Sequence, residues 1–413
     1  MSITMPVGAG ALLTHRSFLF FLLSRSLSRF SSLVGIVAFG WQVYDLTGSA
    51  FALGMMGLAG FLPTALLVFV AGNVADRYER KRILQACQFA EALTALLLAW
   101  GAYAGWLTVV DLFIAVLVLG TTAAFENPAT AALLPLVVPE GAVQRATALS
   151  SGSAQLATIM GPALGGIAYA VSPALPYGLM VLLWLLAALF AGMIRLMLPA
   201  APRGAATLKG SARPGDLFAG VNFIRNHPTI LGTLSLDLFA VLFGGITALL
   251  PIYARDILQT GPWGLGILRA APAVGALLTT AVLARQPIAR RVGIRMFQAV
   301  IVYGVATVAF SLSHWMWLSV VALAILGAAD TVSVVIRFSL VQLATPNEMR
   351  GRVGAVNFLF INASNNLGQF ESGVTAALLG AMPAAVLGGV ATIAIALAWM
   401  KLFPTLRDVE RLE

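Results

Sequence analysis

Charged residues are scarce in this sequence. Only 10% of its 413 residues are Asp, Glu, Lys or Arg, and 60% are hydrophobic. Soluble globular chains carry about 25% charged residues, so this chain has too few charges to cover a water-exposed surface of its size. Its mean hydropathy of +0.92 agrees. We therefore expect most of the surface to face lipid.

Cysteine and histidine are also rare. Cys87 is the single cysteine, which excludes an intramolecular disulfide and a cysteine-based metal cluster. His15, His227 and His314 are too far apart in the chain to have metal-ligand spacing. We expect no metal and no cofactor. We also expect that the protein is not an enzyme, because the sequence shows no cluster of a nucleophile with a base and no paired acids. A nucleotide-driven pump is disfavoured because the chain has no Gly-x-x-x-x-Gly-Lys-Ser/Thr loop.

Long apolar runs dominate the chain, and each is long enough to cross a bilayer, which takes about 20 residues. The first run continues too far to be a cleavable signal sequence. We predict twelve transmembrane helices: Phe18–Tyr44, Ala50–Val74, Ile83–Gly105, Val110–Leu134, Ala148–Val171, Tyr177–Met197, Ile230–Tyr253, Trp263–Leu283, Met296–Leu312, Met316–Leu343, Val353–Leu379 and Ala384–Leu402.

The net charge of +9 comes from basic residues in alternate loops, which is the pattern of membrane orientation and not of nucleic-acid binding. The opposite loops are almost bare, with Arg255 as the exception. The positive-inside rule therefore predicts that both termini are cytoplasmic. The basic loop positions are Arg77, Arg80, Lys81, Arg82, Arg145, Arg195, Arg203, Lys209, Arg213, Arg225, Arg285, Arg290, Arg291, Arg295, Arg350, Arg352, Lys401, Arg407 and Arg411.

The chain divides nearly in half. We predict a six-helix half over residues 1–198, a cytoplasmic linker over 199–229 and a second six-helix half over 230–413. Within the linker, Asp216–Asn226 reads as a short amphipathic helix on the membrane surface. Its apolar face would comprise Leu217, Phe218, Val221 and Ile224.

The two halves echo each other at a constant offset. Duplicated six-helix halves are typical of secondary transporters, whose substrate cavity lies near the membrane midplane between them. The matching positions are Gly120, Leu136, Pro139, Arg145, Gly161 and Gly166 in the first half, and Gly327, Leu343, Pro346, Arg352, Gly368 and Gly373 in the second.

The segment from Gly72 to Lys81 resembles the Gly-x-x-x-Asp-Arg-x-Gly-Arg-Arg/Lys loop of the major facilitator superfamily. Gly72, Asp76, Arg77 and Arg80 match that motif, whereas Glu79 replaces its second glycine. The resemblance implies a gate that latches one conformation and is released in the other. Physically, we expect Gly72 to permit close helix packing. The alternative is a plain cytoplasmic loop.

The fifth predicted span carries a second motif, Gly161-Pro162-Ala163-Leu164-Gly165-Gly166. It resembles the Gly-Pro-x-x-Gly-Gly core of the superfamily's antiporter branches. Its glycines permit tight helix packing, and Pro162 removes a backbone hydrogen bond and bends the helix. Ordinary small-residue packing is the alternative interpretation.

Nearly the whole chain is similar to the branch of enterobactin exporters and macrolide-efflux proteins. The resemblance implies an exporter, usually one that exchanges protons for its substrate; composition and repeat do not by themselves indicate export. The segments that carry it include Trp41–Ser49, Asn127-Pro128, Phe223–Pro228, Asp237–Ala240, Leu249–Pro251, Leu268–Pro272, Pro346–Arg352 and Gly368–Gly373.

Charged residues inside predicted spans are costly, so they normally face a cavity and pair with one another. The candidates for coupling or cavity roles are Arg25, Arg29, Glu126, Asp237, Asp330, Arg337 and Glu371, with Glu91 less favoured. A carboxylate shielded from water can exchange a proton near neutral pH. Static ion pairs are the alternative. The fourth span lacks the arginine that superfamily proton antiporters often carry there; Arg25, Arg29 or Arg337 could replace it.

These observations predict a monomeric, all-α membrane protein of the major facilitator fold in a bacterial inner membrane. We expect it to export a small amphiphile, drug or siderophore by alternating access, with protons as the coupling ion. Beyond the substrate, the protons and the lipid bilayer, we expect no partner, and no nucleic acid. The competing hypothesis is a non-transporting membrane protein such as a sensor or scaffold, which would not need so many buried charges.

Overall fold

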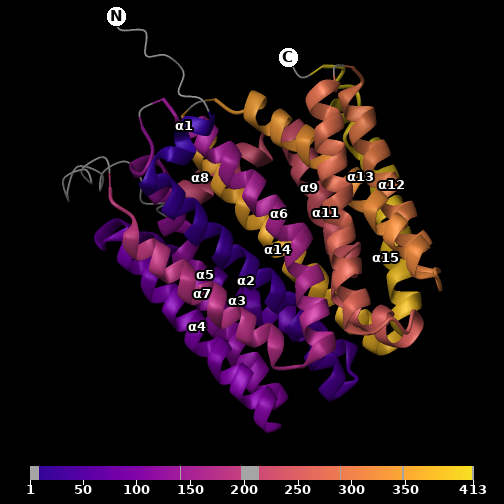
Figure 1. The fold of residues 1–413 in the computed structure, drawn as a ribbon. Helices are drawn as coiled ribbons and strands as arrows, with labels where there is room; N and C mark the ends of the chain where they lie inside the picture. Colours follow the sequence, from indigo (N-terminus) through magenta and orange to yellow (C-terminus); the bar gives the residue numbers. More distant parts are fainter. Residues whose placement is uncertain (1–8, 140, 197–213, 289, 347, 412–413) are drawn as a thin grey trace, which may run out of the picture. The chain divides into compact units, whose positions relative to one another are not determined.

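The computed structural model describes residues 9–139, 141–196, 214–288, 290–346 and 348–411. Eleven of the twelve predicted spans each coincide with one helix, and the seventh is broken (Figure 1). The chain divides into two compact units, which are treated separately below. Unit 1 comprises residues 1–42 and 62–211, and unit 2 comprises residues 43–61 and 212–413. The predicted all-helical membrane fold is thereby confirmed.

Unit 1 contains most of α2 (Arg16–Thr47) and the second part of α3 (Ala50–Arg77). It is completed by α1 (Ala9–Thr14), α4 (Arg80–Ala104), α5 (Val109–Leu133) with the short 3-10 turn η1 (Leu134–Leu136), α6 (Val143–Val171) and α7 (Leu175–Met193). The sixth predicted span ends earlier than expected, at Met193, and Met197 lies outside the described residues.

Unit 2 contains the end of α2 and the beginning of α3 together with the C-terminal helices. These helices are α8 (Pro214–Arg225), α9 (Pro228–Phe243), α10 (Leu250–Ile252), α11 (Gly261–Arg285), α12 (Val292–Ser311), α13 (Met316–Ala344), α14 (Arg350–Leu379), α15 (Ala381–Leu402) and α16 (Pro404–Arg407). The segment 43–61 thus groups with the C-terminal helices, whereas the predicted halves divide at the linker.

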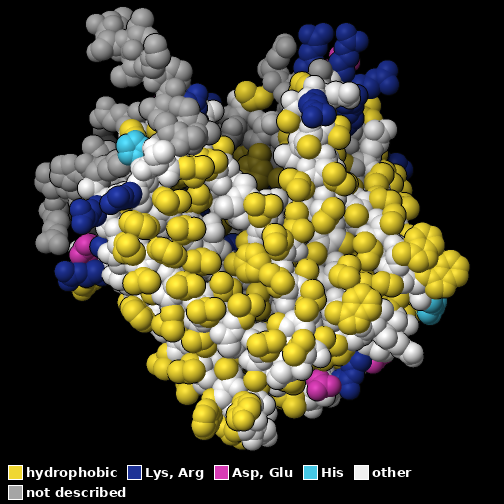
Figure 2. Space-filling model, viewed as in Figure 1, with side chains coloured by type: hydrophobic (Ala, Val, Ile, Leu, Met, Phe, Trp, Pro, Cys, Tyr) yellow, Lys and Arg dark blue, Asp and Glu magenta, His cyan; other side chains and the backbone are white. Residues whose placement is uncertain are grey.

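Eleven of the described helical segments are long and apolar enough to cross a membrane. The remaining predicted span is α14, a 30-residue helix that is more polar because it carries Asn357, Asn362, Asn365 and Asn366. Large apolar side chains lie exposed along the helices; Leu66, for example, is 68% exposed. Figure 2 shows these hydrophobic side chains covering the flanks of the helices, with Lys and Arg gathered near helix ends. This surface suits lipid and not water.

The seventh span is not the continuous helix that was predicted over Ile230–Tyr253. Helix α9 ends at Phe243, and the 3-10 turn η2 (Ile246–Leu249), α10 and the π-helical turn η3 (Tyr253–Ile257) follow. Two hydrogen bonds satisfy carbonyls at the break: Tyr303 donates to Gly244 O (3.1 Å) and Thr392 donates to Ala240 O (3.1 Å). Buried polar partners of this kind make a broken helix tolerable at membrane depth.

The predicted amphipathic segment of the linker forms α8, which packs on the beginning of α14. Ile224 is 4% exposed and belongs to an apolar cluster with Val353 and Val356, whereas Val221 is 42% exposed. The side chains of Leu217 and Phe218 lie outside the described part, as does the linker over 197–213. Helix α8 is therefore a packed part of unit 2, where the sequence predicted a helix resting on the membrane surface.

Candidate functional site

Unit 1 gathers a cluster of polar side chains around Glu126, on α5. Its Oε1 accepts hydrogen bonds from the Ser28 hydroxyl (2.9 Å) and from the Gln88 amide (3.1 Å). Gln88 also donates to the Ser24 hydroxyl (3.2 Å). Ser24, Ser28 and Gln88 are buried. Glu126 thus lies in a network that joins α2, α4 and α5 and holds its carboxylate in one position.

The predicted arginines Arg25 and Arg29 belong to the same region of unit 1. They lie four residues apart on α2, one turn of the helix, and so share a face. Both are close enough to Glu126 for electrostatic attraction. With Arg337, they stay the candidates to replace the arginine that the fourth span lacks. An ionised Glu126 is attracted to both arginines, whereas a protonated Glu126 is not.

Glu91, less favoured on sequence grounds, lies in this region as well. Its side chain is 3% exposed on α4 and is close enough to Glu126 for the two carboxylates to repel each other. Thr122 on α5 hydrogen-bonds to it. Two neighbouring acids with two nearby arginines are suited to exchange a proton, because protonating one acid relieves the repulsion.

The predicted gate motif occupies the turn between α3 and α4. Arg77 ends α3 and Arg80 begins α4, so two residues join these helices. The expected close packing at Gly72 is not seen, since a Cβ atom there would meet no described atom within 4 Å. In the same turn, Lys81 donates to Ile194 O (3.0 Å) and Glu79 pairs with Arg82 (2.7 Å). The side chain of Asp76 lies outside the described part, and a gating role for this motif stays a prediction.

The Gly161–Gly166 motif packs α6 against α2 within unit 1. Gly161, Pro162, Gly165 and Gly166 are all buried. A Cβ on Gly161 would lie 2.7 Å from Leu33 Cβ, and one on Gly165 would lie 2.7 Å from Val34 O. Such distances are too short for any larger residue, so these glycines are needed for the close approach of the two helices. A function beyond packing stays a prediction.

Unit 2 holds a second group of intramembrane charges. Asp237 on α9 and Arg337 on α13 form a buried ion pair, with side chains 10% and 3% exposed. Asp237 also lines a cavity of about 20 Å³ with Asp330, Tyr303 and Ser333. That volume has room for about one water molecule. No partner for Asp330 occurs among the described residues, so unit 2 places two carboxylates near one cavity with a single arginine paired to one of them.

The last predicted acid, Glu371, stands apart from this ion pair. It lies partly buried on α14 and accepts a hydrogen bond from Thr375 (2.8 Å) on the next turn of its own helix. In the part of the chain that is described, no basic side chain pairs with Glu371. It is therefore a weaker candidate for a static structural ion pair than Asp237.

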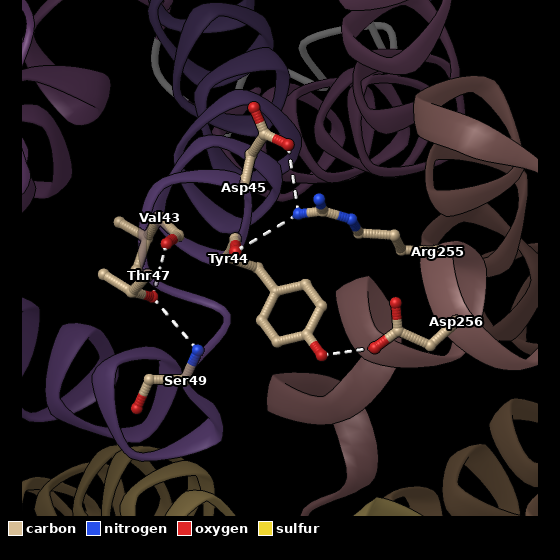
Figure 3. Close-up of polar contacts among 7 residues, drawn as sticks. All are labelled: Val43, Tyr44, Asp45, Thr47, Ser49, Arg255 and Asp256. Carbon is tan, nitrogen blue, oxygen red and sulfur yellow. Dashed lines mark hydrogen bonds and ion pairs between the residues drawn. The ribbon is translucent and has the colours of Figure 1, made fainter.

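Sequence reasoning missed a polar clasp at the end of α2, drawn in Figure 3. The Arg255 guanidinium pairs with Asp45 (3.0 Å), donates to Tyr44 O (3.3 Å) and lies over the Tyr44 ring, 5.6 Å from its centroid. The Tyr44 hydroxyl donates to Asp256. The clasp therefore fastens the end of α2 to the π-helical turn η3, and π-helical turns often occur at functional sites.

Neighbouring contacts in unit 2 hold the segment 43–61 in place. Gly54 on α3 meets Gly373 on α14 so closely that a Cβ on Gly54 would lie 3.0 Å from Gly373 Cα. Phe51 and Phe370 pack edge to face beside them, with centroids 6.4 Å apart.

The one sequence signal for the clasp was Arg255, the basic residue in otherwise bare loops. Gln88 could have been noticed as a polar residue in an apolar span.

The fold and these intramembrane charges define the class of the protein, a major-facilitator transporter. The family described as "Transmembrane secretion effector" matches residues 7–413, and the chain belongs to that family. It is a family of membrane transporters and not of enzymes. The resemblance read from the sequence motifs is thereby confirmed.

Similar proteins with known names are also membrane transporters. The chain is 28% identical over 358 residues to the "Multidrug efflux pump Tap" of Mycobacterium tuberculosis, covering 82% of each chain. It is 27% identical over 321 residues to the "Enterobactin exporter EntS" of Shigella boydii, covering 76% of this chain and 72% of that one. Among solved structures, a mutant of the nucleoside transporter NupG matches with a TM-score of 0.74 at 14% identity, covering 94% of this chain and 99% of that one. The last likeness concerns the fold alone.

Proposed function

We propose that the protein exports a small amphiphile, drug or siderophore from the cytoplasm and that proton entry drives the export. The relatives named as a multidrug efflux pump and an enterobactin exporter support export. The single observation that supports proton coupling best is Glu126, an intramembrane carboxylate fixed by Ser28 and Gln88 beside Arg25 and Arg29. Ionisable residues in such positions commonly act as proton relays.

In this mechanism Glu126 takes a proton from the more acidic outer side and releases it to the cytoplasm as the protein alternates access. Protonation removes the attraction between Glu126 and the two arginines, which frees their charge for another partner. Asp237, Asp330, Arg337 and Glu371 are the further candidates for coupling. The motif at Gly72, Asp76, Arg77 and Arg80 would act as the gate, and the clasp at Arg255 would open and close during the cycle.

A flux measurement tests this function. Inverted membrane vesicles containing the protein should take up a fluorescent amphiphilic dye when their interior is made acidic, because export from the cytoplasm becomes uptake in this orientation. Vesicles with the Glu126→Gln variant and vesicles without the protein are the controls. Dye uptake that is the same with and without the pH gradient would reject proton coupling. Absence of uptake for a panel of dyes, macrolides and siderophores would reject export of this substrate class.

We also propose that the protein lies in a bacterial inner membrane as a monomer, with both termini and the linker 199–229 in the cytoplasm and six-helix halves over 1–198 and 230–413. The Lys and Arg asymmetry of the loops supports this orientation. Single cysteines placed in the linker of a Cys87→Ser background should react with an impermeant thiol reagent only after cells are opened. A cysteine at residue 173, between α6 and α7, should react in intact cells and serves as the matched control. Labelling of the linker from outside would overturn the orientation.

A further inference from the structure

A long apolar groove runs between α11 and α12 in unit 2. Both helices pack extensively on α13 but barely on each other, so α13 forms the floor of the groove. Its volume is about 460 Å³. Leu283, Val302, Ile325 and Val332 line its length, and Arg295 and Gln298 line it near the beginning of α12.

Close helix crossings explain why the groove stays open. A Cβ on Gly275 of α11 would collide with the Ala324 carbonyl of α13, whereas a Cβ on Gly304 of α12 would lie 2.8 Å from the Gly389 carbonyl of α15. These glycines thus allow α11 to pack closely on α13 and α12 to pack closely on α15. Because α11 and α12 both pack on α13 but barely on each other, and α12 packs about as extensively on α15, the surface of α13 between them is left uncovered.

One end of the groove is strongly basic. Arg295 is exposed in the first turn of α12, and Arg285 is exposed at the end of α11. Arg290 and Arg291 lie exposed in the turn between these two helices. No described carboxylate pairs with any of these four arginines. Since α11 and α12 are membrane spans, their basic ends lie at the level of the lipid headgroups. Val302 is seven residues beyond Arg295, about 10 Å deeper along the helix.

Basic pockets between transmembrane helices are sites for anionic lipid headgroups, and guanidinium groups bind phosphate through two parallel hydrogen bonds. We propose that this groove binds one anionic phospholipid, with its phosphate on Arg295 and one acyl chain along Val302 and Ile325. Gln298, one turn beyond Arg295, would hydrogen-bond the glycerol or phosphate oxygens. The inference requires only that the chain spans a membrane and does not depend on export or proton coupling.

The bound lipid would also lie close to the intramembrane charges of unit 2. Ala299 and Ala329 line both the groove and the small cavity that contains Asp237 and Asp330. An acyl chain in the groove would therefore lie one alanine side chain away from that cavity. It would contact both α12 and α13 beside that cavity.

Native mass spectrometry of the purified protein can test the site. The protein would be incubated with equal amounts of phosphatidylglycerol and phosphatidylcholine, and bound lipid would be counted for each. Phosphatidylglycerol should be retained preferentially by the unaltered chain. Arg295→Gln should lower its retention about fivefold, the equivalent of about 1 kcal/mol for one basic side chain near the headgroups. Val302→Trp should lower it as well by filling the groove.

Matched variants separate this site from general lipid adhesion. Arg225→Gln removes an exposed charge from α8, which does not line the groove, and Val305→Trp adds an equal ring on α12 outside it. Both variants should retain phosphatidylglycerol. All four positions are exposed, and melting temperatures would confirm that the variants fold. Equal retention of the two lipids by the unaltered chain would overturn the proposal. So would unchanged phosphatidylglycerol retention in both Arg295→Gln and Val302→Trp.

Discussion

Replacing Arg337 by methionine is expected to lower the stability of the protein by about 3–5 kcal/mol, because the change strands the buried carboxylate of Asp237 without its partner. The Asp237 and Arg337 side chains are only 10% and 3% exposed. A carboxylate so deeply buried has no water to replace the lost arginine. The expected observation is a large drop in melting temperature in detergent, together with loss of the monodisperse peak in size-exclusion chromatography.

A second variant tests whether the stranded charge is the cause. Adding Asp237→Asn to Arg337→Met removes both charges, and we expect this double variant to recover most of the stability. Arg285→Met, which changes an exposed arginine in the same unit, should leave the melting temperature unchanged. If Arg337→Met has the melting temperature of the unaltered protein, the ion pair does not contribute to stability. If the double variant stays as unstable as the single one, the defect arises from lost packing of the Arg337 side chain.

Replacing Glu126 by glutamine is expected to abolish transport driven by a pH gradient while leaving a folded protein that still binds substrate. Glutamine keeps the shape of the side chain and an oxygen that can accept from Ser28 and Gln88. Its amide cannot take up and release a proton in the way a carboxylate does. Transport driven by the pH gradient should therefore fall to the level of vesicles without the protein. Substrate exchange across the membrane without a gradient should continue, because alternating access itself does not require the proton.

The other acids and an exposed one provide the comparison. Asp237→Asn, Asp330→Asn and Glu371→Gln would be measured in the same way. Glu410→Gln, at an exposed position after α16, is the matched control that should transport normally. An acid that serves only as a static ion pair should lose its function through misfolding, whereas a coupling acid should lose pH dependence in a folded protein. Full pH-dependent transport in all four intramembrane variants would show that the coupling depends on another group.

The positions of the helices could be predicted because each apolar run must satisfy its own backbone hydrogen bonds in lipid. The break after Phe243 could not, because Gly244, Gly245 and Pro251 lie in a run that is as apolar as an unbroken span. What permits the break is a pair of long-range hydrogen bonds, from Tyr303 to Gly244 and from Thr392 to Ala240.

The candidate site, too, could be predicted from the sequence only in part. Burial cost alone marks Glu126, Asp237 and Arg337 as residues in need of partners. Their partners depend on contacts between side chains distant in the chain, as Asp237 and Arg337 are a hundred residues apart. Gln88 and Ser28 were missed because a neutral polar residue in a span is inexpensive and common. A Cβ on Gly72 would meet no described atom within 4 Å, and the packing role of this glycine stays a prediction.

The sequence by itself determined that this protein is a helical membrane transporter of the major facilitator superfamily, since hydropathy, loop charge and motif spacing are local properties that survive without any tertiary contact. Only the tertiary structure decided which charges meet, where a helix breaks and where a groove lies open. Arg255 illustrates this: the sequence shows an isolated arginine in a bare loop, whereas the fold joins it to Tyr44 and Asp45. The groove beside Arg295 likewise exists because α11 and α12 both pack on α13 but barely on each other. Such features arise from the packing of distant segments, and packing geometry is set by the whole fold.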